Sequence, residues 1–270
     1  MDGGCALAPR AVAAMFPDAG WTFVTANPFN AEECARDRFG ENFQIQKKIY
    51  AVTDALCRSG RTGHIMIGGD HSVNFGHFAA LADNCDDDLR LVYIDAHFDI
   101  HTPESGRMEA SGAPHGSNIR ALLGTGDKRW MTLPQKQPSL RPENLFYLGV
   151  RSYEQSEEEF VRDNNIFVRT PEQLATQKDW ASAIKEIRAR IGGHPFVLSF
   201  DFDSLNPEVF RNVLVPASSG ITSKAAEFFL REFSDAIAFE FVEYAPSGCE
   251  KSAELVKKLI GIIAEDKRRD

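Results

Sequence analysis

The chain has 270 residues, of which 43% are hydrophobic and 26% are charged, and its formal net charge is −9 at pH 7. This is the composition of a globular protein large enough to bury a core of its own, and an acidic chain without clustered Lys and Arg excludes the usual nucleic-acid footprint. No stretch approaches the roughly 20 apolar residues of a membrane span, and the five scattered cysteines indicate reduced thiols, so we expect a cytoplasmic protein without a membrane partner.

Apolar runs of strand length alternate with helical patterns along the chain. The predicted strands are 21–25, 64–67, 89–94, 145–150, 166–169, 196–200 and 238–243. The predicted helices are 31–58, which a break near Gly40 can divide, 73–82, 117–123, 154–163, 171–191, 223–233 and 250–264. Several strands are apolar on both faces, which is typical of a parallel sheet covered by helices on both sides. With no repeat or low-complexity linker, we expect one α/β domain spanning residues 1–270.

The loops after the strands are the places to search for function, because ligands of parallel α/β sheets gather at the carboxyl ends of the strands. The segments 99–116 and 203–222 are two such loops. The segment 125–144 runs instead from a helix into a strand, so we expect it at the opposite edge, in packing or subunit contact.

Three short motifs place metal-binding residue types directly after apolar runs. They are G-G-D-H-S at 68–72, D-A-H-F-D at 95–99 and D-F-D at 201–203. If these strands are neighbours in one sheet, their ends bring together His71, Asp95, His97, Asp99, Asp201 and Asp203. A single D-x-H or D-x-D motif is a weak signal, often a helix cap or a solvated turn, but the combination of three predicts a metal site.

The charges of this donor set indicate which metal it holds. Clustered carboxylates raise one another's pKa unless cations lie between them, and two divalent ions balance the charge of four aspartates. The set contains no thiolate, which argues against structural zinc, and the imidazoles favour a transition ion over Mg²⁺ or Ca²⁺. We therefore expect two Mn²⁺ ions per chain.

The motifs together resemble the ureohydrolase family, which contains arginase, agmatinase, guanidinobutyrase and formimidoylglutamase. The resemblance rests on the three motifs above, on S-F-D-F-D-S-L-N-P at 199–207 and on V-E-Y-A-P at 242–246, in the family's order along nearly the whole chain. It implies a three-layer α/β/α fold with a mostly parallel central sheet. It also implies a ligand set in which His71 and Asp99 hold one ion, His97 and Asp203 mainly the other, and Asp95 and Asp201 bridge them.

The resemblance implies two catalytic residues besides the ligands. His115, in H-G-S-N at 115–118, matches the family's active-site histidine and is the candidate proton shuttle. Glu243, at the end of the last predicted strand, resembles the glutamate that pairs with the cationic end of the substrate. Asp70 is open to two interpretations, support of a ligand or simple turn chemistry.

Substrate-binding residues are expected in two loops. His101 and Ser111 lie in the loop after Asp99, and Glu154 and Glu157 lie near positions that arginases use for the α-amino group. His101 stands where arginases carry asparagine, whereas N-F-G-H-F at 74–78 is similar to formimidoylglutamase, so the substrate stays open within the family. The segment 3–10 resembles the loop that follows the family's first strand. We therefore expect that strand to be missing from the sheet.

The sequence thus predicts a binuclear manganese hydrolase that cleaves a C–N bond of a small linear guanidino or amidino compound by attack of a hydroxide held between the ions. Such an enzyme is expected to be a homo-oligomer. Two alternatives stay open: a catalytically silent relative that acts as a binding or regulatory protein, and a metal-dependent deacetylase with one zinc ion. The presence of all six ligands argues against the first, and the number of aspartates argues against the second.

Overall fold

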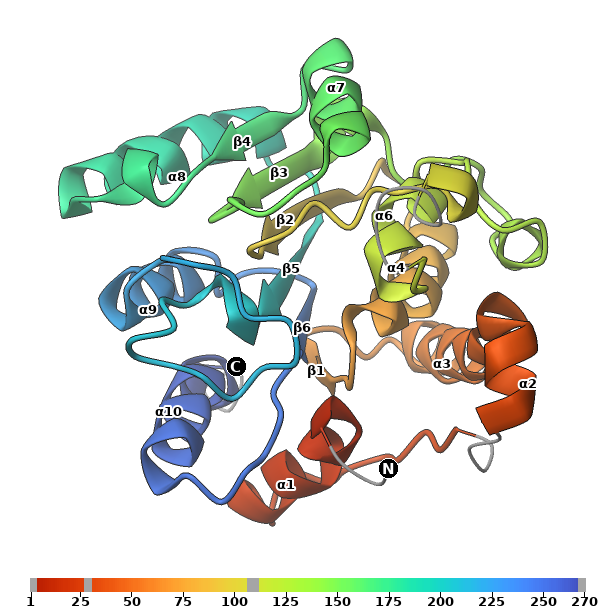
Figure 1. Ribbon diagram of the computed structural model, residues 1–270, viewed down its shortest axis with the longest axis horizontal. Coiled ribbons are helices and arrows are strands. Elements are labelled where there is room, and N and C mark those ends of the chain that lie inside the picture. The colour runs from red at the N-terminus through yellow and green to blue at the C-terminus, as the bar shows by residue number, and fades with distance from the viewer. Residues whose placement is uncertain (1–3, 27–30, 106–111, 267–270) are drawn as a thin grey trace.

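A parallel sheet of six strands forms the centre of the protein. The computed structural model describes residues 4–26, 31–105 and 112–266. The strands are β1 (His64–Ile67), β2 (Arg90–Ile94), β3 (Leu145–Leu148), β4 (Phe167–Arg169), β5 (Phe196–Asp201) and β6 (Ala238–Val242). Their order is β1-β6-β5-β2-β3-β4, every neighbouring pair is parallel, and Figure 1 shows them side by side across the molecule.

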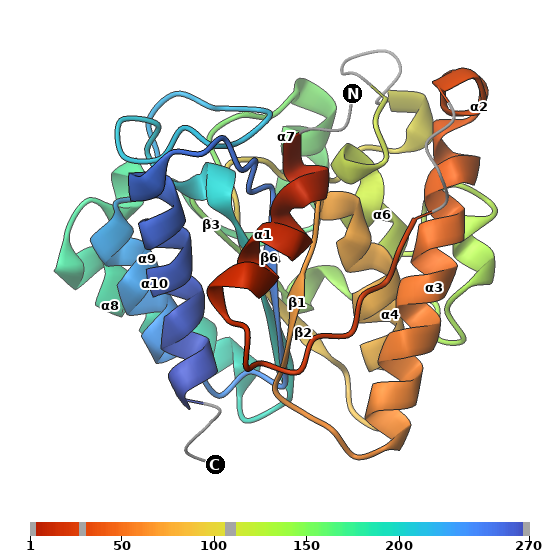
Figure 2. The ribbon, with the colours of Figure 1, turned by 90° about the horizontal axis from the view of Figure 1, so that it is seen from below.

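Helices cover both faces of this sheet, as Figure 2 shows. One layer contains α1 (Ala8–Met15), α8 (Gln177–Ile191), α9 (Ser223–Glu232) and α10 (Glu250–Asp266), and the other contains α3 (Arg38–Arg58), α4 (Asn74–Asp83), α6 (Asn118–Leu122) and α7 (Gln155–Asp163), with α2 (Ala31–Arg36) beside α3. Successive side chains of a strand point to opposite faces. In β2, Val92 and Ile94 accordingly pack into the first core, and Leu91 and Tyr93 into the second. The predicted three-layer architecture is confirmed.

The predicted strands after residue 60 agree with β1 to β6 within two residues, whereas the predicted strand 21–25 is wrong. That segment carries strand-forming residues but lies in an irregular stretch with no sheet neighbour, and Phe23 is half exposed. Trp21 instead donates its indole N–H to the carbonyl of Phe16. Without a partner strand or a buried face, the local preference of such residues does not produce a strand.

The chain before this segment is more ordered than the loop expected over 3–10. Residues Gly4–Leu7 form a 3-10 helix and α1 follows directly, starting at Ala8 with Pro9 in its first turn, where proline is tolerated. Val12 of α1 is buried in the core. Within the described residues the first strand is β1, which lies at an edge of the sheet with α1 against it.

Capping residues set the helix starts that periodicity alone misplaced. The predicted helix 31–58 breaks at Asp37 rather than at Gly40, because the Asp37 carboxylate accepts a hydrogen bond from the Gly40 N–H and starts α3. The predicted helix 171–191 likewise begins late, at Gln177, where Thr176 and Asp179 form a capping box.

The segment 125–144 packs against the helices, as expected, but it is not structureless. It contains two 3-10 turns, Trp130–Thr132 and Pro142–Asn144. Trp130 is fully buried and stacks on Phe75 of α4 with ring centroids 4.9 Å apart. No helix in the described parts of the chain is long and apolar enough to cross a membrane.

Candidate metal centre

The predicted ligands meet at the carboxyl ends of adjacent strands. His71 follows β1, Asp95 follows β2, and Asp201 is the last residue of β5. The register pairs Ile94 with Phe200, so the residues that come next, Asp95 and Asp201, leave neighbouring strands side by side. The sheet topology therefore brings residues from distant parts of the chain to one point.

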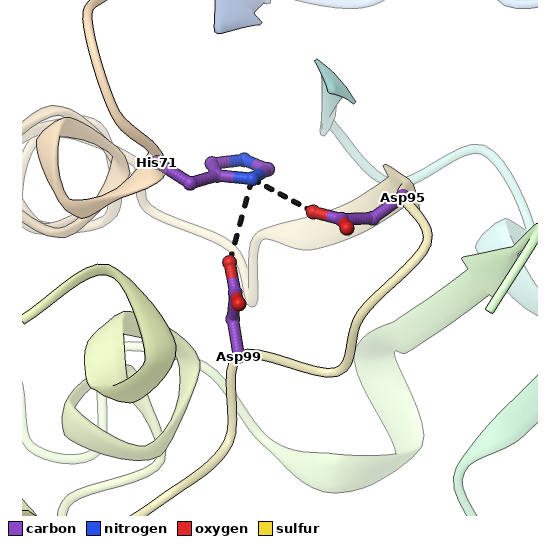
Figure 3. A group of neighbouring side chains, drawn as sticks. All are labelled: His71, Asp95 and Asp99. Carbon is purple, nitrogen blue, oxygen red and sulfur yellow. Dashed lines mark ion pairs between the residues drawn. The ribbon is translucent and has the colours of Figure 1, made fainter. Parts of the chain in front are cut away.

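The first group of donors surrounds the imidazole of His71. Its Nδ1 atom lies 2.8 Å from Asp95 Oδ2, 3.0 Å from Asp201 Oδ2 and 3.5 Å from Asp99 Oδ2. Figure 3 shows Asp95 and Asp99, both on the segment that follows β2, converging on His71. The side chains of His71, Asp95, Asp99 and Asp201 are all buried.

The second group shares a carboxylate with the first. His97 Nδ1 lies 3.0 Å from Asp203 Oδ2 and 3.5 Å from Asp95 Oδ1. The donor atoms within each of the two groups, His71 with Asp95 and Asp99, and Asp95 with His97 and Asp203, lie within 4.8 Å of one another. Asp95 belongs to both groups, as a bridging ligand must. The His97 side chain is more exposed than the other ligands, so the second group lies nearer to solvent.

Two buried atoms in the first group lack hydrogen-bond partners, which is the observation that best fits a cation. His71 Nδ1 and Asp95 Oδ2 lie 2.8 Å apart, yet neither makes a hydrogen bond. On its other side, His71 Nε2 lies 2.8 Å from Ser199 Oγ. If Nε2 carries the proton and donates it to Ser199, the lone pair of Nδ1 is free to bind metal, and outer hydrogen bonds of this kind commonly orient ligating histidines. The donor set therefore fits a metal ion.

The pKa values of the clustered histidines and aspartates indicate that this site favours positive charge. Burial alone would lower the pKa of His71 and of His97, but the adjacent aspartates raise these pKa values to about 9 and about 12. Burial and the charge of Asp95 raise the pKa of Asp99 to about 6, and burial and Asp203 raise that of Asp201 well above its ordinary value. Carboxylates packed this closely without solvent are stabilised by cations among them.

Backbone N–H groups hold the aspartates in place. The His97 N–H donates to Asp95 Oδ1 over 2.7 Å, and the Asp203 N–H donates to Asp201 Oδ1 over the same distance. Asp99 adopts a positive φ of 53°, a conformation that non-glycine residues rarely adopt. Backbone strain of this kind is often found at functional sites, where the surrounding structure maintains it.

Glu243, predicted at the substrate, follows β6 and lies beside the first group. Its Oε1 accepts a hydrogen bond from the His71 N–H over 3.0 Å, its φ is 62°, and only 6% of its surface is exposed. Burial and the charge of Asp70 raise the pKa of Glu243 to about 7. Asp70 itself accepts a hydrogen bond from the Ser72 N–H, which is the turn interpretation left open by the sequence.

His115, the predicted proton shuttle, begins a 3-10 turn after the loop that carries Asp99. Its side chain is half-buried, and its charge lowers the pKa values of both Asp99 and Glu243, opposing their burial. The Asn118 amide donates to the His115 carbonyl over 2.7 Å and to Asp99 Oδ2 over 3.2 Å. The candidate shuttle is thereby joined to a candidate ligand.

Three of the four predicted substrate-binding residues form one cluster. His101 Nε2 lies 2.9 Å from Glu154 Oε2 and 3.4 Å from Glu157 Oε2. Burial and the neighbouring Glu154 raise the pKa of Glu157 to about 9. Glu157 also accepts hydrogen bonds from the Glu154 and Ile100 N–H groups and so starts α7. Ser111 lies outside the described residues.

Sequence analysis missed several residues that contact this site. They are Cys5, Tyr93, Asn118 and Ser199. Two of them had a usable signal, because Tyr93 and Ser199 stand two residues before an aspartate ligand, at positions that share the aspartate's face of the sheet. Cys5 carried none, since only the folded chain brings residue 5 to Glu243.

Comparison with known proteins gives a consistent result. The model of the Arginase family matches residues 2–264. The chain is 30% identical to the arginase of Bacillus subtilis over 209 residues, which are 73% of this chain and 68% of that protein. It is 28% identical to the arginase of Bacillus caldovelox over 232 residues, 83% of this chain and 75% of that one.

Solved structures share the fold. A crystal structure of the Bacillus subtilis arginase superposes with a TM-score of 0.84 at 24% identity, covering 97% of this chain and 95% of the other. The formimidoylglutamase of the same species superposes with a TM-score of 0.77 at 16% identity, over 98% and 82% of the two chains. At these identities the likeness supports the architecture rather than a substrate.

Proposed function

The chain belongs to the arginase family, whose members are hydrolases acting on C–N bonds of linear amidines, and on this premise we propose that it is a binuclear manganese hydrolase of a small guanidino or amidino compound. The observation that carries the proposal is Asp95, which is shared by two groups of buried nitrogen and oxygen donors. A carboxylate shared between two imidazole-containing groups is an arrangement suited to a pair of ions.

The two ions would be held as the family resemblance implies. His71 and Asp99 would bind one ion, His97 and Asp203 the other, with Asp95 and Asp201 between them. The distances around His71 and His97 support the roles of Asp99, Asp95 and Asp203, while the distance of Asp201 supports a place beside His71. Imidazole with carboxylate and no thiolate suits manganese better than structural zinc.

The reaction would combine the bound metals with three functions of the chain's own residues. When bound, such a pair of ions supplies a hydroxide nucleophile at neutral pH by lowering the pKa of water. Glu243 would pair with the planar cation of the substrate, because a fixed carboxylate accepts two parallel hydrogen bonds from it. His115 would deliver a proton to the leaving amine. His101, Ser111, Glu154 and Glu157 would contact the far end of the substrate.

The proposal is tested by a substrate panel assayed with manganese-loaded protein. The panel contains arginine, agmatine, guanidinobutyrate, N-formimidoylglutamate and hydroxyarginine, and both urea and formamide are measured. We expect turnover of one guanidino or amidino compound and close to two manganese ions per chain by elemental analysis. One zinc ion per chain would instead favour the deacetylase alternative, and two manganese ions without turnover of any compound would favour a silent relative.

The homo-oligomeric state and the cytoplasmic location remain predictions of the proposed enzyme. Light scattering coupled to size-exclusion chromatography would measure the first. Fractionation of the source cells would measure the second.

A further inference from the structure

The thiol of Cys5 contacts the residue proposed to recognise the substrate. Cys5 Sγ donates a hydrogen bond to Glu243 Oε2 over 3.0 Å, although 238 positions separate the two residues in the chain. The other carboxylate oxygen, Oε1, accepts the N–H of His71 over 3.0 Å. Glu243 is therefore held from two sides, by the chain's first helical turn and by a candidate metal ligand.

The position of Cys5 is fixed by the fold rather than by chance contact of a loose end. The 3-10 turn Gly4–Leu7 continues into α1, whose Ala8 and Val12 are fully buried in the core. The same turn lies against the loop that carries His71. The two backbones are so close that a Cβ atom added to Gly69 would lie 3.5 Å from the carbonyl oxygen of Cys5. Cys5 itself is 2% exposed.

The thiol of Cys5 is protonated and can therefore donate a hydrogen bond. Burial and the negative charge of Glu243 raise the pKa of Cys5 far above its ordinary value, so the sulfur keeps its proton. A buried, protonated thiol is a poor nucleophile and metal ligand, because both roles need the thiolate. What remains to it is the hydrogen bond to Glu243.

Glu243 keeps acceptor capacity for a further partner. A carboxylate offers about four lone-pair positions, and the hydrogen bonds to Cys5 and His71 use two of them. The hydrogen bond from the His71 N–H places the same carboxylate beside a candidate metal ligand. Fixing its orientation in advance reduces the entropy that would be lost when a planar cation binds.

We propose that Cys5 is a positioning residue, which holds the carboxylate of Glu243 in the orientation that binds the cationic group of the substrate. The inference rests on the proposed function, because it takes Glu243 as the group that binds the substrate. It assigns to the start of the chain a role in substrate binding and none in metal binding.

Three variants separate this role from a merely structural one. Cys5→Ala removes the donor, Cys5→Ser keeps one, and Cys57→Ala removes a half-buried thiol of α3 as a matched control. We expect Cys5→Ala to raise KM roughly five- to tenfold, as loss of one hydrogen bond from a weak thiol donor would, with kcat and bound manganese nearly unchanged. Cys5→Ser and Cys57→Ala should both stay within about twofold of the wild-type KM.

Opposite results would overturn the inference. An unchanged KM in Cys5→Ala, an equal loss in Cys5→Ser, or a loss of manganese from Cys5→Ala would each show that the thiol does not act through Glu243 on substrate binding. Melting temperatures of all variants identify a variant that has failed to fold, and the comparison then relies on Cys5→Ser.

An infrared measurement tests the contact independently of activity. The S–H stretching band that disappears in Cys5→Ser belongs to Cys5, and it should move to higher frequency in Glu243→Gln, because a neutral amide is a weaker acceptor than a carboxylate. A band that does not move would overturn the inference. If the wild-type protein hydrolyses no compound of the panel, the proposed function fails, while this band still decides whether the thiol holds Glu243.

Discussion

The hydroxyl of Tyr93 donates a hydrogen bond to Asp99 Oδ2 over 2.8 Å, from within the buried strand that ends at the metal centre. The ring of the same tyrosine stacks on the imidazole of His71, with centroids 4.3 Å apart and planes 9° from parallel. One side chain thus supports both candidate ligands of the first ion, by a hydrogen bond to one and by ring contact with the other. Outer contacts of this kind orient metal ligands.

Replacing Tyr93 with phenylalanine should weaken the binding of the first ion. Tyr93→Phe keeps the stacking on His71 and removes only the hydroxyl, so Asp99 loses a donor that fixes its carboxylate. We expect manganese affinity to fall about tenfold, in the range typical of lost outer hydrogen bonds, as measured by isothermal titration calorimetry. Tyr50→Phe is the matched control, because it removes a phenol–carboxylate hydrogen bond, to Asp83, away from the site. Equal affinity in both variants would contradict the role of Tyr93.

Replacing His97 should remove one ion and leave the other bound. His97 contacts Asp203 and the shared Asp95, whereas His71 keeps its own neighbours Asp99 and Asp201, so His97→Ala should lose turnover and retain close to one manganese ion per chain. The melting temperature with manganese should fall below that of the wild type, because clustered carboxylates then lack their cation. Turnover assays and elemental analysis measure both effects. Full activity in His97→Ala would refute the binuclear assignment.

Removing metal should destabilise the wild-type protein. A ligand that binds only the folded state adds about 2.7 kcal/mol at a hundredfold excess over its Kd, so manganese should raise the melting temperature and a chelator should lower it. In Asp201→Asn, this difference between the manganese-bound and chelated protein should shrink. The asparagine also removes a carboxyl group whose ionised form the metal-free cluster disfavours, because burial and the charges of Asp203 and Asp95 raise the pKa of Asp201, so the chelated variant should melt no lower than the chelated wild type. A lower melting temperature would mean that the carboxylates stabilise each other without metal.

Glu243→Gln should impair substrate binding more than metal binding. The amide keeps the shape of the side chain but loses the charge that would pair with a planar cation. KM should rise about tenfold or more, while manganese stoichiometry stays near the wild-type value. Loss of manganese from this variant would place Glu243 among the metal ligands instead.

The metal centre could be predicted from the sequence because its ligands stand directly after strands. Parallel pairing brings strand ends to one edge, so recognising the strands before His71, Asp95 and Asp201 was enough to place these side chains together. The strand predicted at 21–25 failed because its residues favour a strand only when a neighbouring strand or a buried face is present.

The contact of Cys5 with Glu243 depends on a distance that no local pattern contains. Cys5 reaches Glu243 only because the first turn lies across the loop after β1. His101 and Glu154, by contrast, were both predicted as substrate-binding residues from the resemblance, and they form a direct contact of 2.9 Å. Site residues that belong to a family motif can thus be predicted from the sequence, whereas a residue such as Cys5, which only the fold brings to the site, cannot.

A contact between the half-buried His64 and the buried His77 should make the protein sensitive to acid independently of its metals. His64 Nε2 lies 2.8 Å from His77 Nε2, and His77 Nδ1 lies 2.5 Å from Glu240 Oε1. Burial and the charge of His77 lower the pKa of His64 to about 4, below its ordinary value of 6.5. As the pH falls from 6.5, the unfolded chain takes up a proton at His64 before the folded protein does, so stability present above pH 6.5 is lost down to about pH 4. The loss attributable to His64 is at most on the order of 3 kcal/mol.

His64→Gln removes this titration and should flatten the fall in unfolding free energy between pH 6.5 and about pH 4. Urea denaturation measures this free energy, with a chelator present so that metal release does not contribute. An identical slope in the variant and the wild type would show that His64 does not titrate differently in the folded and unfolded states.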